Sequence, residues 1–417
     1  MPFRGRIRRN DRQAGWVFTV VGDKTIVQSV MSELAPYIPA GEAQLQRWLE
    51  TSVGYHVGHA RSGRLKWAIT LSGKDSLTET FIAWMSMRHL RRHGFPVTMT
   101  VVHNDTMVED PVLHAVMVDT LHWMQKQAAA EELPVSIRLV QPPLERRPFY
   151  QIFVKGYPAP NRQFRYCTRS WKTSPTNEAL LDEAPDILAL GVRRNESQAR
   201  DRRLQEQDRI RAVECTLGGS ECGQDVLLKQ ESGLLPNTLR IAPIEHWTSV
   251  QEIWVLLREI APKFGWPSAA LEKAYPADES RLGCWLCTLV TRNLSLEDKV
   301  REPEFSKYQC LLDWRERYQK MCLDPNYRSL KNAEEVQMGE QVALVGEVSC
   351  LTYEARNILY QAWLDAEETL GQELMDPESR EHVEAELRKD IKLPPAFMHR
   401  LVLRRKQGGM SQQKWAL

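Results

Sequence analysis

A short polar run, Ser72-Gly73-Lys74-Asp75-Ser76, combines the residue types that bind phosphate. The lysine adds positive charge, the two serines add hydroxyl donors, and the glycine lets the backbone approach an anion closely. Asp75 would repel a bare phosphate, so it suits a magnesium ion bound with the phosphate, or the N-terminal cap of a helix. We predict a nucleotide-phosphate site here, with a plain capped turn as the alternative.

The flanking residues predict that this run joins a buried strand to a helix. The apolar stretch 65–70 precedes it, and Leu77, Phe81 and Trp84 follow at helical spacing until Gly94, where a helix should end. A helix N-terminus presents unpaired backbone N–H groups and the positive end of the helix dipole. Both favour a bound anion.

Two further polar stretches follow predicted strands. Asp105 comes after the β-branched run 97–102, where it could bind a ribose, an adenine amine or magnesium, or cap the next helix. Gly191-Val192-Arg193-Arg194 comes after the run 186–190 and continues to Ser197 and Arg200. The glycine permits a tight turn, and the arginines can hold phosphate oxygens in pairs. The charged stretch 200–211 is typical of a solvated face.

Cysteine usage points to metal or redox chemistry. The chain has eight cysteines and no visible signal peptide, which favours thiols over disulfides. Cys284 and Cys287 form a Cys-x-x-Cys pair, which suits zinc, an iron–sulfur cluster or a redox dithiol, and half of the ligands must then come from elsewhere. Cys215 and Cys222 lie in a glycine-rich stretch, and we interpret them as bystanders rather than ligands.

Cys167 is the leading candidate for a further ligand or a nucleophile. Arg165, Arg169 and Lys172 are close to it in the sequence. Cations near a thiol lower its pKa and favour the thiolate, which is the reactive and metal-binding form. A buried, inert cysteine is the alternative.

The elements that must position these residues alternate between strand and helix from residue 66 to residue 190. Such alternation predicts an α/β fold, with a parallel sheet and helices on both faces. Ligands bind beyond the carboxyl ends of the strands in such a sheet. We expect four stretches to meet there as one nucleotide site: Ser72–Ser76, Asn104–Thr106, the Cys167 segment and Gly191–Arg194.

We expect three regions along the chain. They are a basic and helical segment over 1–64, a nucleotide-binding domain over 65–260 with an insertion near 212–240, and a Cys-x-x-Cys segment followed by a mostly helical region over 261–417. The chain has a net charge of +1, so DNA binding would depend on local patches such as the arginines within 1–12 and 400–406, unless these are solvated arms. No apolar run is long enough for a membrane span, so we expect a cytoplasmic protein that does not bind membranes.

The Ser72–Ser76 run resembles the pyrophosphate loop of the ATP pyrophosphatase and PAPS reductase superfamily, with Leu71 and Ser72 replacing the usual Ser-Gly start. Further segments, taken in order, resemble the DNA phosphorothioation sulfurtransferases of the DndC and SspD type: Gly156–Pro160, Arg165–Pro175, Gly191–Arg200, Ile244–Trp254 and Arg281–Thr288. Ala277 stands where that family has another cysteine. The resemblance implies an adenine nucleotide alpha hydrolase-like fold.

The resemblance also implies an enzyme that uses ATP and Mg²⁺ to adenylate a DNA backbone phosphate and then replaces a non-bridging oxygen with sulfur. The implied catalytic residues are Lys74, Asp75, Cys167, Arg193 and Arg194. The implied nucleotide-binding residues are Ser72, Gly73, Lys74, Asp75, Ser76, Asp105, Arg169, Lys172, Gly191, Arg193, Arg194, Ser197 and Arg200. DNA, a cysteine desulfurase as sulfur donor and other proteins of the phosphorothioation system would be the partners.

The implied metal group is an iron–sulfur cluster, of the 4Fe-4S type, held by Cys167, Cys284, Cys287 and Cys310, with Cys322 as the alternative fourth ligand. Three protein ligands with one open iron are a second possibility, and zinc or reduced thiols are a third. Two other functions stay open. One is a sulfonucleotide reductase that acts on a small molecule, and the other is a degenerate nucleotide-binding scaffold in a DNA-defence complex.

Overall fold

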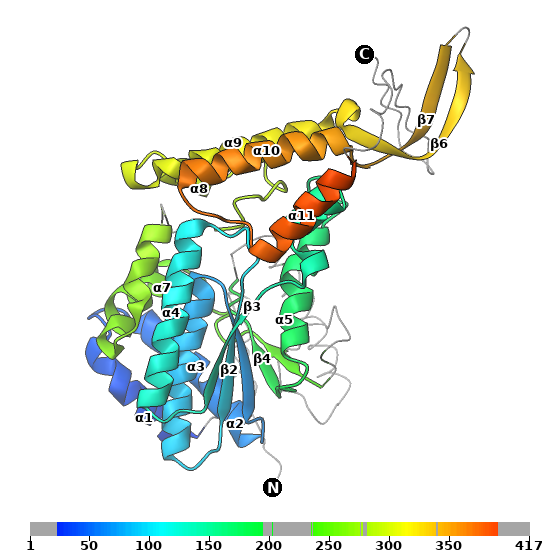
Figure 1. The fold of residues 1–417 in the computed structure, drawn as a ribbon. Coiled ribbons are helices and arrows are strands. Elements are labelled where there is room, and N and C mark those ends of the chain that lie inside the picture. Colours follow the sequence, from blue (N-terminus) through cyan, green and yellow to red (C-terminus); the bar gives the residue numbers. More distant parts are fainter. Residues whose placement is uncertain are drawn as a thin grey trace. The chain divides into compact units, whose positions relative to one another are not determined.

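The structure is a computed structural model that describes residues 23–194, 202, 235, 237–275, 277, 282–338 and 341–390, without the side chains of 331–348 and 390 (Figure 1). The basic stretches within 1–12 and 400–406 and most of the insertion near 212–240 lie outside these residues. The chain forms two compact units. The first comprises 1–104, 111–140 and 176–281, and the second comprises 105–110, 141–175 and 282–417.

The first unit is built on a five-stranded parallel sheet, as predicted. Its strand order is β3-β2-β1-β4-β5, and all neighbouring pairs are parallel. The strands are β1 (Lys66–Leu71), β2 (Thr98–Asn104), β3 (Val135–Val140), β4 (Ile187–Ala189) and β5 (Leu239–Ile241).

The chain winds outward from the central strand in two directions. It runs from β1 to β2 and β3 on one side, and later to β4 and β5 on the other. Ile69 of β1 is therefore flanked by Val101 of β2 and Ala189 of β4, and all three side chains are buried. The strand order reverses between β1 and β4, and the carboxyl ends at such a switch point form the crevice where α/β sheets bind ligands.

Helices pack along this sheet, and Figure 1 shows α3 and α4 beside its strands. The helices of the first unit are α1 (Lys24–Leu34), α2 (Ala43–Arg61), α3 (Lys74–Arg92), α4 (Pro111–Ala130) and α7 (Gln251–Val255), and helical turns continue from α7 through 256–264 and 267–274. Leu77, Phe81 and Trp84 of α3 are buried, as their spacing predicts. Gly94 follows the end of α3 with φ +85°, a conformation that glycine adopts without strain.

The second unit is mainly helical, as predicted for the C-terminal region. It contains α8 (Leu294–Lys299), α9 (Gln309–Leu323), α10 (Tyr353–Leu370) and α11 (Pro377–Asp390), and the chain passes between the two units within α5 (Ser174–Ala179). Its core is rich in indole rings. Trp285 stacks on Trp363 with ring centroids 5.7 Å apart, and Trp314 meets both rings edge-on.

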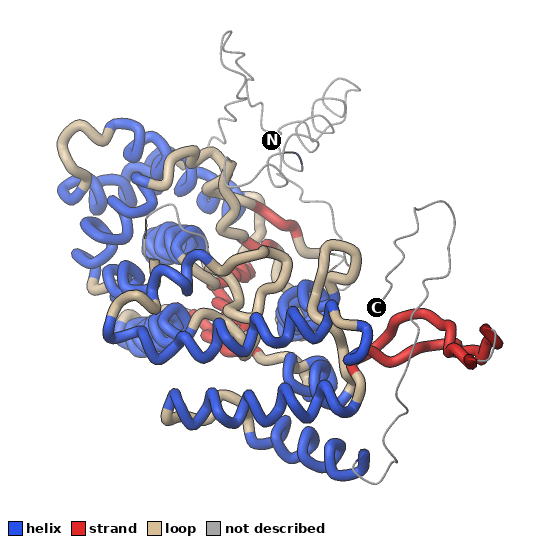
Figure 2. Tube along the Cα trace, turned by 90° about the horizontal axis from the view of Figure 1, so that it is seen from above, coloured by secondary structure: helices blue, strands red, loops and turns tan. Residues whose placement is uncertain are grey.

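A β-hairpin interrupts this helical region and was not predicted. Strands β6 (Arg328–Met338) and β7 (Gln341–Leu351) pair antiparallel, and Figure 2 shows them extending away from the helices of the same unit. Residues 331–338 include lysine, alanine, glutamates, glutamine and methionine, which favour helices on their own. Strand pairing therefore overrides local propensity here.

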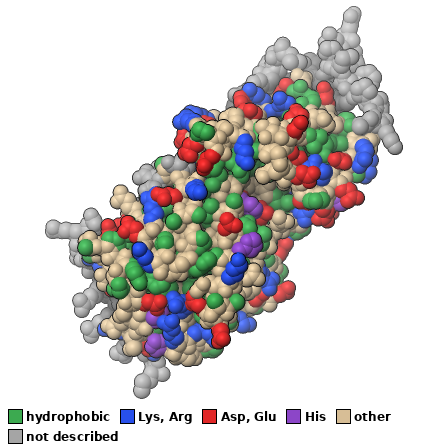
Figure 3. Space-filling view, turned by 60° about the vertical axis from the view of Figure 1, so that its left-hand side comes forward, with side chains coloured by type: hydrophobic (Ala, Val, Ile, Leu, Met, Phe, Trp, Pro, Cys, Tyr) green, Lys and Arg blue, Asp and Glu red, His purple; other side chains and the backbone are tan. Residues whose placement is uncertain are grey.

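The surface carries charges of both signs. On the face drawn in Figure 3, Lys and Arg side chains alternate with Asp and Glu side chains, in keeping with the net charge of +1. Within the described residues, no helix combines the length and the apolar character that crossing a membrane requires.

Candidate functional site

The pyrophosphate loop (Ser72–Ser76) connects β1 to α3 in the first unit, as predicted. The Ser76 hydroxyl lies inside the loop, where it accepts hydrogen bonds from the backbone N–H groups of Ser72 at 2.7 Å and Gly73 at 3.0 Å. It also lies 3.0 Å from the Gly73 carbonyl, to which it can donate. Ser76 therefore fixes the shape of the loop, whereas the sequence suggested that its hydroxyl binds phosphate directly.

A tyrosine from a distant part of the chain contacts the same loop. The phenol oxygen of Tyr275 accepts a hydrogen bond from the backbone N–H of Lys74 at 3.1 Å. The Lys74 ammonium group lies 4.4 Å from the centre of the Tyr275 ring. The backbone N–H and the ammonium group of Lys74 could both bind a phosphate, and both contact the Tyr275 side chain. Nothing in the spacing of the sequence pointed to Tyr275.

The end of β4 closes on the loop, as the switch-point geometry predicts. A Cβ atom placed on Gly191 would lie 2.5 Å from the backbone nitrogen of Ser76, so only glycine fits at this position. Arg193 follows, and its Nε donates to the Asp75 carboxylate at 2.5 Å. Both side chains are mostly buried, which strengthens a charge-assisted hydrogen bond. The structure therefore brings together Gly73, Lys74, Asp75, Ser76 and Arg193.

Other predicted residues of this strand end have different partners or lie outside the description. Arg194 faces the Glu245 carboxylate at 3.7 Å and donates its backbone N–H to the Glu245 carbonyl at 2.9 Å. Ser197 and Arg200 lie outside the described residues. Asp105 belongs to the second unit, where it accepts from the Met107 backbone at 2.7 Å and from the Gln141 side chain at 2.9 Å. These bonds form a local turn rather than a helix cap, because the next helix, α4, begins only at Pro111.

The second unit gathers three of the predicted cysteines around one lysine. Cys167 interacts electrostatically with both Cys284 and Cys287. Lys172, five residues after Cys167, forms a hydrogen bond with Cys284 and also interacts with Cys287 and Glu109. The proximity of Cys284 is the main influence that raises the pKa of Lys172, so its ammonium form is favoured there.

Local packing holds the two cysteine segments in place. The backbone N–H of Cys287 donates to the Cys284 carbonyl at 3.0 Å, which closes the Cys-x-x-Cys turn, and the buried Trp285 between them packs into the indole core. Cys167 immediately precedes the helical turn Thr168–Thr173, whose Trp171 is also buried. The prediction that Cys167 follows a strand is wrong, because β3 ends at Val140 and the intervening chain is helical or irregular.

The prediction that cations lower the pKa of Cys167 is wrong in net direction. Burial raises the pKa of this thiol, and the neighbouring Cys284 raises it further. A hydrogen bond with Thr168 and the charge of Lys172 oppose this shift without cancelling it. Arg165 and Arg169 are exposed, so water screens their charge.

Cys310 lies in the first turn of α9, and its thiol donates to the Lys307 carbonyl at 3.2 Å. Burial raises the pKa of the Cys310 thiol. Within the described part of the second unit, Cys310 contacts none of the three cysteines Cys167, Cys284 and Cys287. Cys322 is buried beside Ala159, with a pKa raised to about 11. The structure thus groups Cys167, Cys284 and Cys287 and places these two thiols elsewhere.

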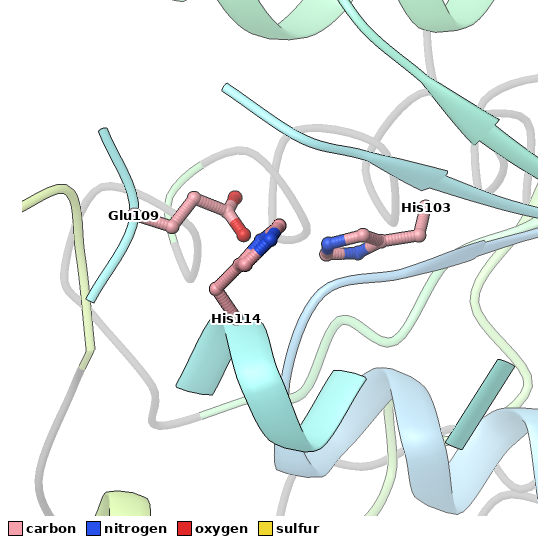
Figure 4. A group of neighbouring side chains, drawn as sticks. All are labelled: His103, Glu109 and His114. Carbon is pink, nitrogen blue, oxygen red and sulfur yellow. The ribbon is translucent and has the colours of Figure 1, made fainter. Parts of the chain in front are cut away.

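Two histidines at the carboxyl end of β2 were not predicted. His103 ends the buried part of β2, and His114 lies in the first turns of α4, with ring centroids 6.2 Å apart. Figure 4 shows the two rings side by side. The Nδ1 of His103 lies 2.8 Å from the Leu71 carbonyl and donates to it, because a carbonyl oxygen can only accept.

Comparisons with known proteins agree with this architecture. Residues 67–290 match the phosphoadenosine phosphosulfate reductase domain, which is more than half of the chain. No curated protein matches this chain significantly.

Solved structures with similar chains include three proteins of low sequence identity. The FMN adenylyltransferase of Candida glabrata shares 12% identity over 56% of this chain and 65% of its own, with a TM-score of 0.31, so the match spans just under two thirds of its length. The PAPS reductase of Candida auris shares 14% identity over 63% of this chain and 96% of its own, with a TM-score of 0.30. The U34-tRNA thiolase NcsA of Methanococcus maripaludis was solved with its [4Fe-4S] cluster. It shares 13% identity over 72% of this chain and 81% of its own, with a TM-score of 0.30.

The predicted parallel sheet, the pyrophosphate loop after its central strand and the domain match over residues 67–290 agree with one another. The chain belongs to the phosphoadenosine phosphosulfate reductase domain family.

Proposed function

We propose that this protein is an ATP-dependent sulfurtransferase that activates a backbone phosphate of DNA and replaces one non-bridging oxygen with sulfur. The observation that supports it most strongly is the grouping of Cys167, Cys284 and Cys287 around Lys172 in a chain that also has a pyrophosphate loop. Nucleotide activation and sulfur transfer need these two parts. In the cytoplasm, where thiols stay reduced, all three cysteines would be available for the chemistry.

The first step would form an adenylated phosphate. A non-bridging oxygen of the DNA phosphate attacks the α-phosphorus of ATP, the bond from that phosphorus to the oxygen bridging to the β-phosphorus breaks, and pyrophosphate leaves with Mg²⁺. The Lys74 ammonium group and the N–H groups at the start of α3 would stabilise the negative charge that develops on the leaving pyrophosphate. Asp75 would hold the magnesium ion, and Arg193 is the cation that already contacts Asp75.

The second step would transfer sulfur. A persulfide on Cys167, loaded by a cysteine desulfurase, attacks the activated DNA phosphorus with its terminal sulfur, and AMP leaves. The thiolate of Cys284 then attacks the sulfur atom of Cys167, which releases the phosphorothioate and leaves a disulfide between the two cysteines. The released sulfur gains two electrons, which the two thiols supply, and a cellular dithiol must reduce the disulfide. The Lys172 side chain, which forms a hydrogen bond with Cys284, would lie beside the attacking sulfur.

An iron–sulfur cluster fits the same three cysteines. Soft thiolate donors select iron–sulfur clusters and zinc, and Cys167, Cys284 and Cys287 offer three from two segments. When bound, a cluster with one iron free of protein ligands would supply inorganic sulfide in place of the Cys167 persulfide, because cysteines that hold iron would not also form the disulfide. Cys310 contacts Lys307 instead, so three protein ligands are the arrangement we propose. Other proteins of a phosphorothioation system would supply the DNA target and the sulfur.

The family match supports a second candidate, a reductase that acts on a small sulfonucleotide. That reaction needs a nucleophilic cysteine and a reductant but releases no pyrophosphate from ATP. The two are separated by measuring pyrophosphate release from ATP with DNA present and sulfonucleotide absent. We expect release that Lys74→Met abolishes and that Lys66→Met, at the exposed start of β1, leaves intact. Sulfite release from a sulfonucleotide without ATP turnover would favour the reductase.

A further inference from the structure

The surface around residues 161–169 of the second unit is strongly basic. From Arg146 to Asn177 the chain has seven Lys or Arg residues and no Asp or Glu. Arg147 and Lys155 are balanced by acidic residues from outside this stretch. Arg162, Arg165 and Arg169 are exposed and form no ion pair with any residue in the described part of the chain. Three uncompensated arginines within eight residues attract a polyanion.

An aromatic side chain is exposed within this basic segment. Phe164 is 42% exposed, although burying it would be favourable. Its ring lies against Tyr166 and Tyr157, with centroid distances of 4.9 and 5.9 Å. Tyr166 in turn packs edge-on against the buried Trp171 at 5.5 Å. The Phe164 ring is thus supported from below by a chain of aromatic contacts that reaches the core.

The backbone of this segment is also fixed. The side-chain oxygen of Asn161 accepts hydrogen bonds from the N–H groups of Gln163 at 2.9 Å and Phe164 at 2.8 Å. The Tyr166 hydroxyl donates to the Pro158 carbonyl at 3.2 Å. An aromatic ring that is held in place before binding loses little conformational entropy when a ligand stacks on it.

We propose that residues 161–169 are the docking platform for a nucleic-acid strand, with an unstacked base on Phe164 and backbone phosphates at Arg162, Arg165 and Arg169. Stacking on an aromatic side chain requires an accessible base face, so a single strand or an extruded nucleotide fits and an intact duplex does not. The platform runs directly into Cys167, so a strand bound there has a backbone phosphate beside the grouped thiols. This inference rests on the proposed function for the reaction itself, and it identifies residues 161–169 as the surface that binds the substrate of that reaction.

Fluorescence anisotropy of labelled 20-mers tests this, with single-stranded DNA, RNA of the same sequence and duplex DNA as probes. Phe164→Ala should weaken single-strand binding about 5- to 150-fold, the range for loss of one stacked base, and Phe164→Trp should retain it. Arg165→Gln should weaken binding equally for all sequences and lower the slope of log affinity against log salt by about one. Leu323→Ala and Arg301→Gln, both exposed in the same unit, are matched controls and should bind normally.

Each outcome decides the proposal. No binding by the wild-type protein, or equal affinity of wild type and Phe164→Ala, overturns it. Normal nucleic-acid binding by Phe164→Ala together with loss of the complex with an added cysteine desulfurase would make this surface a protein interface instead. Pyrophosphate release from ATP separates a failure of the docking platform from a failure of the proposed function. If the variants lose nucleic acid but wild type never turns over ATP, the platform stands and the proposed function fails. Tighter binding of RNA than DNA keeps the platform and overturns the DNA substrate.

Discussion

Tyr275→Phe removes one oxygen atom from the pyrophosphate loop and leaves the ring in place. In the wild-type protein that oxygen accepts a hydrogen bond from the Lys74 backbone N–H at 3.1 Å. A phosphate bound at the start of α3 needs the same N–H group. The phenol oxygen must therefore move away before phosphate binds, so we expect Tyr275→Phe to bind pyrophosphate more tightly than wild type.

The size of the effect follows from the bond that is exchanged. A hydrogen bond between neutral groups contributes about 0.5 to 1.5 kcal/mol net, which corresponds to about a 2- to 12-fold lower Kd. The ring contact with the Lys74 ammonium, 4.4 Å from the ring centre, persists in phenylalanine and should not add to the change. The edge contact of the ring with Trp254 is also retained, so the variant should fold normally.

Isothermal titration calorimetry with inorganic pyrophosphate and magnesium measures this Kd directly. Tyr37→Phe is the matched control, because Tyr37 is 41% exposed and its ring packs on Phe264. Weaker binding by Tyr275→Phe would show that the hydroxyl is itself a phosphate ligand. An unchanged Kd would show that the Lys74 N–H plays no part in binding phosphate, and either result would refute the reasoning.

Three other changes have defined outcomes. Gly191→Ala should lower the free energy of unfolding in urea by about 1 to 3 kcal/mol and abolish pyrophosphate release, because its Cβ would lie 2.5 Å from the Ser76 backbone; wild-type stability in this variant would contradict the packing. Cys284→Ser should lose bound iron after anaerobic preparation while Cys310→Ser keeps it, as iron and sulfide assays would show, and iron loss in both would instead indicate four protein ligands. Burial lowers the pKa of His59 from its ordinary value of 6.5 to about 3 in the folded protein. Below pH 6.5 this histidine therefore takes up a proton in the unfolded chain but not in the folded chain. The free energy of unfolding consequently falls as the pH drops from 6.5 towards 3. His59→Gln should reduce that loss by about 2 to 3 kcal/mol at pH 4.5 in urea titrations, while the same change at the exposed His122 should not.

The sheet was predictable because its signals are local. The strands predicted at 65–70 and 97–102 lie within two residues of their observed bounds, since each is a short apolar or β-branched run beside a helical pattern. The meeting of Gly191 with the pyrophosphate loop was predictable too, because parallel strands place their carboxyl ends at one edge.

The remaining features depend on contacts between residues far apart in the chain. Tyr275 contacts Lys74 across 201 positions, and a single tyrosine has no spacing that reveals such a contact. The pKa direction of Cys167 depends on its burial and on the other thiols, whereas the sequence shows only the nearby cations. The β6–β7 hairpin forms from residues with helical propensity, so pairing between its strands decides the outcome. His103 and His114 are separated by a loop whose path the sequence does not reveal.

The central claim is tested most directly by digesting DNA to nucleotides and measuring phosphorothioate-linked dinucleotides by mass spectrometry. The DNA is incubated anaerobically with the protein, ATP, Mg²⁺, cysteine, a cysteine desulfurase and a dithiol reductant. We predict phosphorothioate linkages with one AMP and one pyrophosphate formed for each sulfur incorporated, and their loss in Cys167→Ser but not in Cys322→Ser. ATP turnover without sulfur in the DNA, or equal incorporation by Cys167→Ser, would contradict the assignment.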